Sequence, residues 1–250
     1  MIIEDESNKI ILPIISAKNV VIGYDSKKPL FELEDFSVYP GEIIVLTGKS
    51  GIGKTTFLKT VAGLIKPISG HLQVLNYTKL GTDISNIKRG ELGYIPQNLG
   101  LVRHATVMHN VMLGANARYK SFWHPFFSND AKESAFTAIE GLGISEYKYK
   151  IVRKLSGGER RRVATARTLA QKPKLILADE FLSELDETTK SVVQNQVLNY
   201  ISNSKASIII VEHDLERAKQ MSDRLFVISD GKLLELPPDN DSMFLKGGDK

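Results

Sequence analysis

The chain has 250 residues, of which 42% are hydrophobic and 25% are charged, as is usual for a soluble globular protein with one large domain or two intimate ones. Its net charge is only +4 and its basic residues are spread along the chain, which argues against a dedicated nucleic-acid binder. The sequence contains no cysteine, and this excludes a disulfide framework, a thiol nucleophile and a cysteine-based zinc site.

Residues 1–13 are predicted to be an N-terminal extension and not a targeting signal. Residues 4–6 are acidic where a signal would be basic, and the apolar run at 10–15 is short and broken by Pro13. No stretch reaches the ~20 apolar residues that a transmembrane helix needs. Any action at a membrane is therefore expected to go through a partner.

Residues 14–46 are predicted to form a small antiparallel sheet. Short apolar runs at 14–15, 20–22, 31–33 and 36–38 alternate with turn signals at 27–29 and 39–41. Tyr24 follows the second run. Taken alone, this tyrosine fits a packed strand residue better than a group that stacks on a nucleobase.

A glycine-rich loop between a predicted strand and a predicted helix occupies the middle of residues 42–63. The β-branched run at 42–47 predicts a buried strand, and the helical spacing at 56–62 ends at Gly63, a C-terminal cap. The loop fits the pattern Gly, four residues, Gly-Lys-Ser/Thr. Its residues are Gly48, Lys49, Ser50, Gly51, Ile52, Gly53, Lys54 and Thr55.

This loop predicts a nucleoside triphosphate site. Its glycines let the backbone curl so that successive N–H groups point inward, and the helix N-terminus adds positive charge at the same place. Lys54 would reach the outer phosphates, and the Thr55 hydroxyl would hold a magnesium ion. A merely flexible glycine loop is the alternative, and the flanking strand and helix disfavour it.

The middle of the chain changes from strand to helical spacing. Strands are predicted at 72–75 and at 92–97, and the second ends at Gln97. Helical spacing then runs from about 106 to 142 and includes an aromatic cluster at 122–127. For this cluster, the core of a helical lobe is favoured over a contact surface for a partner.

A second helix start follows at residues 155–159. Ser156 and Glu159 stand three residues apart, as in a capping box, with Gly157 and Gly158 between them. The stretch fits an anion site at a helix N-terminus and an ordinary capped helix equally well. For the arginines at 160–162, a solvated or phosphate-facing role is favoured over nucleic-acid binding.

Two further buried strands are predicted to end in polar groups. The strand at 175–180 ends in Asp179 and Glu180, and burying unpaired charge is costly, so Asp179 is assigned to magnesium and Glu180 to polarising water. The strand at 207–213 ends in His213, for which a structural role would be usual. A closing hairpin at 225–236 and a weakly ordered tail at 237–250 complete the chain.

Together these stretches resemble the nucleotide-binding subunit of an ATP-binding-cassette (ABC) transporter over roughly residues 15–236. The matching segments are 48–55 for Walker A, Gln97 for the Q-loop, 155–159 for the LSGGQ signature, 175–180 for Walker B, 183–186 for the D-loop, His213 for the switch histidine and Tyr24 for the adenine-stacking aromatic.

The resemblance implies an α/β fold, the P-loop NTPase fold of ABC ATPases, with an N-terminal antiparallel β subdomain and an inserted helical subdomain. A single ABC ATPase domain would span residues 14–236. Residues 14–96 and 156–236 would form its nucleotide-binding core, and residues 97–155 its helical subdomain.

The resemblance also implies a mechanism in which two subunits, in a homodimer or with a non-identical partner, sandwich two ATP molecules head to tail. Catalysis would fall to Glu180 as general base, with His213 and Gln97. Magnesium would be held by Thr55, Gln97 and Asp179. ATP would contact Tyr24, residues 48–55, Thr56 and Asp186, and, from the opposite chain, Ser156, Gly157, Gly158 and Glu159.

The implied partners are a second nucleotide-binding subunit, a transmembrane permease docked on the helical subdomain and a substrate-binding protein, with no nucleic acid. The chain would then sit on the cytoplasmic face of the cell membrane. Among cargo classes, phosphonate-type importers match most, with lipoprotein- and macrolide-type exporters as rivals. A soluble ABC ATPase of the iron–sulfur-assembly type is the alternative function, and DNA-repair ATPases are disfavoured because no long coiled coil separates the motifs.

The chain departs from the family pattern near the expected dimer seam. Phe181 and Leu182 stand where the family has Pro-Thr, and Glu184 replaces the D-loop alanine. Glu159 and Arg161 replace glutamines of the signature. None of these changes removes a catalytic group, so an active ATPase is expected.

Overall fold

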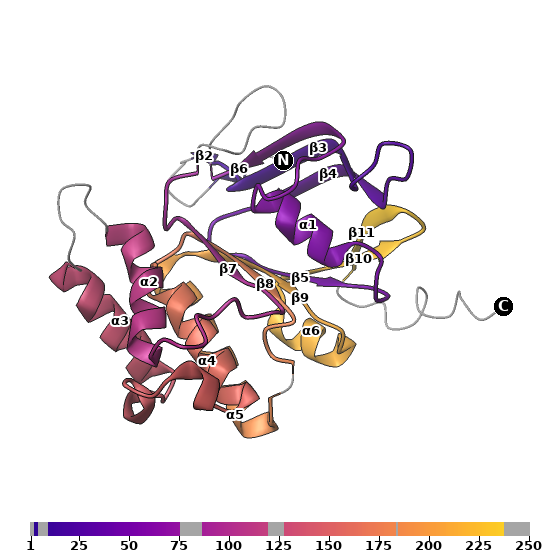
Figure 1. Ribbon diagram of the computed structural model, residues 1–250. Coiled ribbons are helices and arrows are strands. Elements are labelled where there is room, and N and C mark those ends of the chain that lie inside the picture. Colours follow the sequence, from indigo (N-terminus) through magenta and orange to yellow (C-terminus); the bar gives the residue numbers. More distant parts are fainter. Residues whose placement is uncertain (1–2, 5–9, 76–86, 120–127, 184, 238–250) are drawn as a thin grey trace.

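The computed structural model describes residues 3–4, 10–75, 87–119, 128–183 and 185–237 (Figure 1). A two-stranded antiparallel sheet at the N-terminus contains β1 (Ile3–Glu4) and β2 (Ile10–Ile11). The main sheet has nine strands in the order β6-β3-β4-β11-β10-β5-β9-β8-β7. These strands are β3 (Ile15–Ile22), β4 (Phe31–Val38), β5 (Ile43–Thr47), β6 (Ser69–Val74), β7 (Leu92–Ile95), β8 (Leu175–Asp179), β9 (Ser207–Val211), β10 (Arg224–Ser229) and β11 (Lys232–Leu236).

The sheet has an antiparallel part and a parallel part. Strands β6, β3 and β4 pair antiparallel, which confirms the small sheet predicted for residues 14–46. The predicted short runs are nevertheless merged into two eight-residue strands. In β3 the polar pair Lys18 and Asn19 is accommodated by a register shift against β6, with Asn19 at φ 51°. In β4 the acidic residues simply face solvent.

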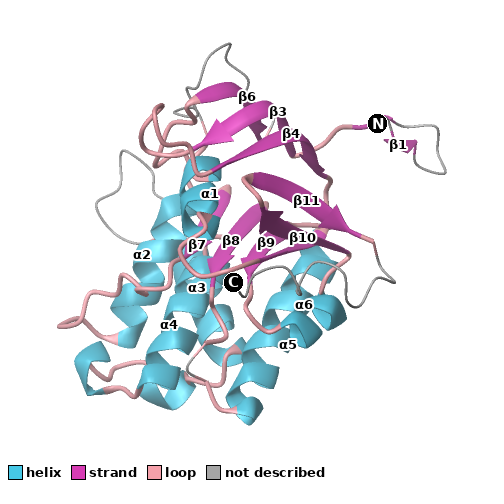
Figure 2. Cartoon of the chain, turned by 90° about the vertical axis from the view of Figure 1, so that its right-hand side faces the viewer, coloured by secondary structure: helices cyan, strands magenta, loops and turns pink. Residues whose placement is uncertain are grey.

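In the described residues, six α-helices lie on the two sides of the parallel strands. They are α1 (Lys54–Val61), α2 (Val107–Tyr119), α3 (Asn129–Gly141), α4 (Gly157–Leu169), α5 (Glu187–Ser204) and α6 (Leu215–Met221), with short 3₁₀ turns at Ser145–Tyr147 and Val152–Lys154. Helix α1 contacts β3, β8 and β9, so the sheet curls around it, and the other helices lie on the opposite side (Figures 1 and 2). None of the helices in the described ranges is long and apolar enough to cross a membrane.

Two helices were not anticipated from the sequence pattern. Helix α5 buries only Val193, Val197 and Ile201, which is a narrow apolar stripe on an otherwise polar helix. Helix α6 has only seven residues. The helical spacing predicted over 106–142 corresponds to α2 and α3, while the aromatic cluster at 122–127 and the tail beyond 237 lie outside the described residues.

The parallel strands are buried on both faces, which explains their uninterrupted apolar sequences. In β9, Ile208 and Ile210 belong to the core on the side of α2–α6, whereas Ile209 and Val211 belong to the core around α1. Val211 pairs with Asp179 of β8 on one side and is level with Leu46 of β5 on the other. The carboxyl ends of these strands therefore meet at one edge of the sheet.

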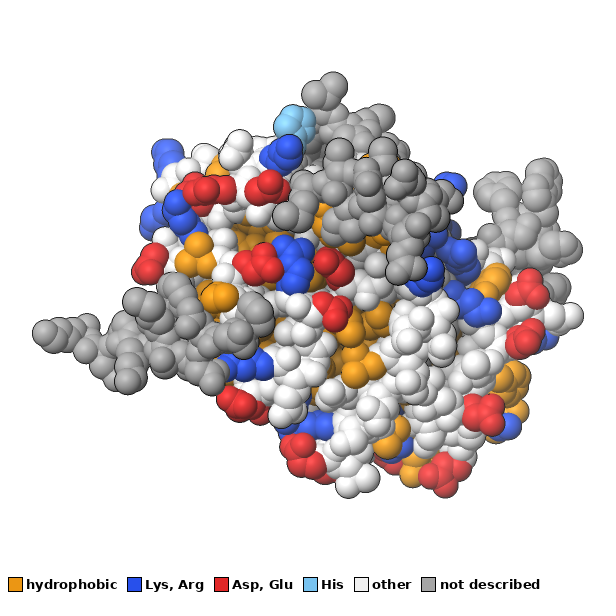
Figure 3. Space-filling model, turned by 180° about the vertical axis from the view of Figure 1, so that it is seen from behind, with side chains coloured by type: hydrophobic (Ala, Val, Ile, Leu, Met, Phe, Trp, Pro, Cys, Tyr) orange, Lys and Arg blue, Asp and Glu red, His pale blue; other side chains and the backbone are white. Residues whose placement is uncertain are grey.

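Charged side chains of both signs are interspersed on the face of the molecule seen in Figure 3. The figure shows lysines and arginines alternating with aspartates and glutamates around small apolar areas. No single-sign patch dominates that face, in keeping with the spread of basic residues along the sequence.

The departure at Phe181 and Leu182 is accommodated in the core. Both side chains are 1% exposed and pack with the helices on the α4 side of the sheet. We expect Phe181→Ala to lower the free energy of unfolding by about 3–5 kcal/mol, because it leaves a large cavity. Urea unfolding measures this, with Phe136→Ala as the matched control because Phe136 is 46% exposed. A loss below about 1 kcal/mol for Phe181→Ala would contradict the packing described.

Candidate active site

Four strands of the parallel sheet deliver the predicted polar residues to one edge. Strand β5 leads into the glycine-rich loop, β7 is followed by Gln97, β8 ends at Asp179 and β9 is followed by His213. In the sheet these strands are neighbours in the order β5-β9-β8-β7. The crevice outside the carboxyl ends of such strands is where open α/β sheets bind ligands.

The glycine-rich loop has a backbone that only glycine adopts readily. Gly48, Gly51 and Gly53 have φ values of 139°, 77° and 116°, and a Cβ on Gly53 would lie 3.1 Å from the Phe31 ring. Helix α1 begins directly after the loop, and no side chain caps its N-terminus. Its first N–H groups are thus left for an anion, as the sequence predicted.

Lys54 lies inside the loop with its ammonium already in place. The residue is 6% exposed, and its Nζ donates to the carbonyl oxygens of Gly48 at 2.7 Å and Lys49 at 2.8 Å. Burial lowers the pKa of Lys54, while the nearby carboxylates Glu180 and Asp179 act against that shift. A buried cation between carbonyl groups is suited to bind a phosphate that arrives in the loop.

Asp179 and Thr55 meet across the sheet edge and fit a magnesium ion. Thr55 Oγ1 donates to Asp179 Oδ2 at 2.8 Å, whereas Asp179 Oδ1 is buried with no hydrogen-bond partner among the described residues. Burial raises the pKa of Asp179. No group of three or more His, Cys, Asp or Glu in the described part of the chain could hold a metal alone. Mg²⁺ is commonly held by one carboxylate, waters and phosphate oxygens, so this pair suits it.

The raised pKa of Asp179 makes a stability prediction with a definite sign. Because burial raises the folded-state pKa above the unfolded value, the native state loses stability as the pH rises through that folded-state pKa. We therefore expect Asp179→Asn to stabilise the nucleotide-free protein at neutral pH and so to raise its Tm.

Calorimetry measures the Tm of the wild type and of Asp179→Asn with and without Mg²⁺ and ATP. The difference in Tm should shrink as the pH falls, while the stabilisation of the variant by Mg²⁺ with ATP is lost. Asp130→Asn is the control, because Asp130 is exposed on α3. A lower Tm for Asp179→Asn at neutral pH would show that the negative charge of Asp179 does not destabilise the fold.

Glu180 lies between Gln97 and His213. Gln97 Nε2 donates to Glu180 Oε2 at 2.9 Å, and His213 Nε2 is 2.6 Å from Glu180 Oε1. The His213 side chain is 45% exposed and contacts the Glu180 carboxylate, which places it for the predicted role at the site. The structure brings the three predicted catalytic residues together.

Tyr24 lies beside the start of α1 and is open to solvent. It is 70% exposed, and its Oη is 3.5 Å from Thr56 Oγ1. The packed strand residue favoured by the local sequence is therefore wrong, because β3 has already ended at Ile22. An exposed aromatic at the rim of a phosphate loop is free to stack on a base.

The second glycine-containing helix start is a complete capping box. Glu159 N donates to Ser156 Oγ at 3.2 Å, and Ser156 N donates to Glu159 Oε2 at 2.6 Å. A Cβ on Gly157 would meet nothing within 4 Å, so packing within this chain does not require glycine there. Asp186 caps α5 in a similar way by accepting from Thr189 N at 2.9 Å.

The expectation of a solvated role for the arginine run is wrong at Arg161. Arg161 is 3% exposed, so its side chain is not solvated. It donates to the backbone of Glu180 and to Ser183 Oγ, two contacts that the sequence did not suggest. Arg162 donates to the carbonyl oxygen of Gly143 at 3.1 Å. Both are occupied by the protein itself.

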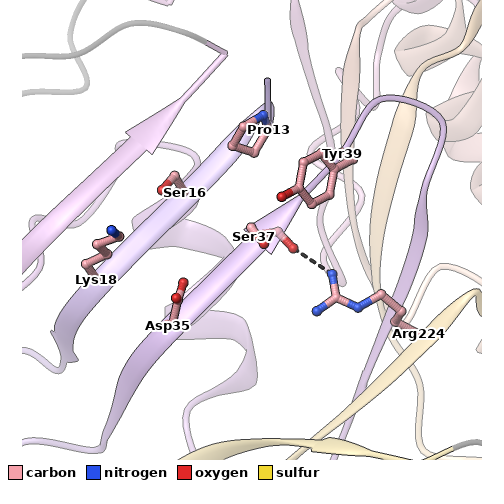
Figure 4. Close-up of a pocket in the computed structure, with 7 residues that line it drawn as sticks. All are labelled: Pro13, Ser16, Lys18, Asp35, Ser37, Tyr39 and Arg224. Atoms are coloured by element: carbon pink, nitrogen blue, oxygen red, sulfur yellow. Dashed lines mark hydrogen bonds between the residues drawn. The ribbon is translucent and has the colours of Figure 1, made fainter. Parts of the chain in front are cut away.

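The residues at the sheet edge form a surface and not an enclosed pocket. A polar cavity elsewhere, on β3 and β4, shares no residue with the glycine-rich loop (Figure 4). It is lined by Pro13, Ser16, Lys18, Asp35, Ser37, Tyr39 and Arg224. Lys49, Ser50 and Gly51 at the crest of the phosphate loop are exposed. A ligand bound there would remain open on one side within a single chain.

Comparisons with known proteins find relatives along most of the chain. The ABC transporter family matches residues 32–183. A phosphonates import ATP-binding protein, PhnC, of Treponema denticola is 30% identical over 230 residues, which cover 88% of each chain. A Fe(3+) ions import ATP-binding protein, FbpC 2, of Haemophilus influenzae is 32% identical over 226 residues, which cover 90% of this chain and 61% of that protein.

A solved structure shares the fold. The dimeric structure of a post-hydrolysis state of an ATP-binding cassette, bound to ADP and Pi, superposes with a TM-score of 0.76 at 24% sequence identity. The match covers 91% of this chain and 100% of that chain. It confirms the predicted fold class, an antiparallel β part and a helical part built around a phosphate-loop core.

Proposed function

The chain belongs to the ABC transporter family and is an ATP-hydrolysing subunit, and from this premise we propose that two copies close around two ATP–Mg²⁺ to drive import through a separate membrane subunit. The observation that supports this most is the meeting of Lys54, the Thr55–Asp179 pair and the Gln97–Glu180–His213 group at one sheet edge. Catalysis of phosphoryl transfer depends on such positioning and charge stabilisation.

Each group would have a separate task in hydrolysis. Lys54 would neutralise charge on the β- and γ-phosphates, and Glu180 would accept the proton of the attacking water. Because Glu180 is now hydrogen-bonded by both Gln97 and His213, one of these would turn away to admit water. His213 would then donate to the γ-phosphate. Asp179 and Thr55, with Gln97 nearby, would hold magnesium, which would neutralise negative charge on the phosphate oxygens.

A second copy of the chain would complete each site. The phosphate loop is open at the surface, and the start of α4 offers the Ser156 hydroxyl and open space at Gly157. We infer that α4 of one chain covers the ATP held by the other, with Ser156, Gly158 and Glu159 at its γ-phosphate and Asp186 at the seam. Tyr24 would stack on the adenine.

The cargo and the membrane partner follow from the relatives. Phosphonates import proteins match along nearly their whole length, so a phosphonate-type solute, delivered by a substrate-binding protein, is the proposed cargo. The permease would dock on the helical subdomain at 97–155, which places the chain on the cytoplasmic side of the membrane. The iron–sulfur-assembly alternative is not favoured, because the relatives named above are import proteins.

Capture of the membrane partner tests the transport proposal. Tagged Glu180→Gln protein with ATP and Mg²⁺ is used to pull down proteins from detergent-solubilised membranes, with Lys54→Ala as the control that should not close around ATP. Co-purification of a polytopic membrane protein with the first variant only is the expected result. Recovery of soluble partners alone would overturn the transport proposal and leave the ATPase assignment standing.

A further inference from the structure

The Arg161 side chain runs from helix α4 into the protein and ends at the backbone of Glu180. Arg161 is the fifth residue of α4 and is 3% exposed. A guanidinium is always charged and has only donors, so burying it requires acceptors in the right places. Two of these acceptors belong to the segment that follows β8.

The contacts of Arg161 converge on one carbonyl group. Arg161 Nη1 donates to the Glu180 carbonyl oxygen at 3.1 Å, and Nη2 donates to Ser183 Oγ at 3.1 Å. Ser183 donates to that same carbonyl oxygen, through Oγ at 2.8 Å and through its N–H at 3.1 Å. The guanidinium thus donates both to the Glu180 carbonyl oxygen and to the Ser183 hydroxyl that binds this carbonyl.

These hydrogen bonds hold the backbone of Glu180 in an unfavourable conformation. Its φ is 51°, in the left-handed region that side-chain-bearing residues avoid and adopt only where the surroundings hold them. The N–H of Glu180 is fixed by the Val211 carbonyl oxygen at 3.2 Å, and its carbonyl by Arg161 and Ser183. With this backbone conformation, the Glu180 carboxylate contacts Gln97 and His213.

We propose that Arg161 is a positioning residue for ATP hydrolysis, which holds the Glu180 backbone so that the carboxylate points at the attacking water. The proposal rests on the function proposed above, in which Glu180 is the general base. Arg161 also belongs to the helix whose first residues face the partner's nucleotide in that proposal, so one side chain connects the two ATP sites of the dimer.

Kinetics of three variants test the proposal. Arg161→Met keeps an unbranched apolar stem but removes both hydrogen bonds, and it should lower kcat roughly 10- to 100-fold with KM for ATP changed less than about twofold. Arg161→Lys keeps one donor and the charge, and should recover most of the loss. Ser183→Ala should lower kcat by roughly threefold, and combining it with Arg161→Met should add less than its own effect.

A neighbouring arginine provides the matched control. Arg162→Met removes a side chain of the same type from the same helix, but its hydrogen bonds run to Leu142 and Gly143 and not to Glu180. It should leave kcat and KM near the wild-type values. If Arg161→Met does not fold, Arg161→Lys and Ser183→Ala decide, since both keep the volume of the site.

Two results would overturn different claims. Wild-type kcat in Arg161→Met, or equal losses in Arg161→Met and Arg162→Met, would overturn the positioning role alone. A rise in KM with unchanged kcat would also overturn it, because the residue would then act on nucleotide binding. Absence of Mg²⁺-dependent ATP hydrolysis in the wild type would instead count against the proposed function.

Discussion

Glu180→Gln is expected to lower kcat for ATP hydrolysis roughly 10²- to 10⁴-fold while ATP still binds. Glutamine has nearly the same shape but cannot accept the proton of the attacking water. Gln97 can still donate to the amide oxygen and His213 Nε2 can accept from the amide NH2, so the geometry around residue 180 should persist. Because closure is then not followed by hydrolysis, the variant should accumulate as an ATP-bound dimer.

Phosphate release measures turnover, and size-exclusion chromatography with light scattering measures dimer formation. The variant should elute as a dimer with ATP and Mg²⁺ and as a monomer without them, whereas the wild type returns to monomer as ATP is consumed. Glu34→Gln is the control, since Glu34 is an exposed carboxylate paired with Lys232 on the antiparallel part of the sheet. Wild-type turnover in Glu180→Gln would show that another group is the base.

The sequence was sufficient to predict the core strands and the candidate site residues that end them. Strands buried on both faces show uninterrupted apolar runs, and the polar residues that end them are conspicuous because burying charge is costly. Gln97, Glu180 and His213 could therefore be placed at strand ends, and the parallel register brings strand ends together. The glycine-rich loop was identified by its spacing alone.

What the sequence could not supply depends on contacts between distant segments. Arg161 is buried because a carbonyl group nineteen residues later accepts from it, and an arginine run gives no sign of that. Its spacing to the buried Thr165 and Thr168 was the one available hint. The packed position first favoured for Tyr24 was wrong for the same reason, since local frequencies favour structural roles and only the fold shows its neighbours.

The active site also carries groups that weaken the fold. Asp179 has a buried oxygen without a hydrogen-bond partner in the described structure, Lys54 is a buried ammonium, and Glu180 has a left-handed backbone. Each costs stability in the nucleotide-free chain, and Asp179 and Lys54 would each gain a partner when Mg²⁺ and ATP bind. Binding should therefore stabilise this edge of the sheet more than any other part of the protein.

Lys54→Ala is expected to weaken ATP binding roughly 10²-fold or more and to bring hydrolysis below detection. The ammonium is fixed by the carbonyl oxygens of Gly48 and Lys49, so it meets the phosphates with little further loss of side-chain entropy, and each charge-assisted hydrogen bond is worth about 1.5–3 kcal/mol. Titration calorimetry with a non-hydrolysable ATP analogue measures the loss, and Lys66→Ala, at an exposed lysine after α1, is the control. Because Asp179 and Thr55 remain in Lys54→Ala, binding that survives should still respond to Mg²⁺. Unchanged affinity in Lys54→Ala would mean that the phosphates do not lie in this loop, and the assignment of every group around it would fail together.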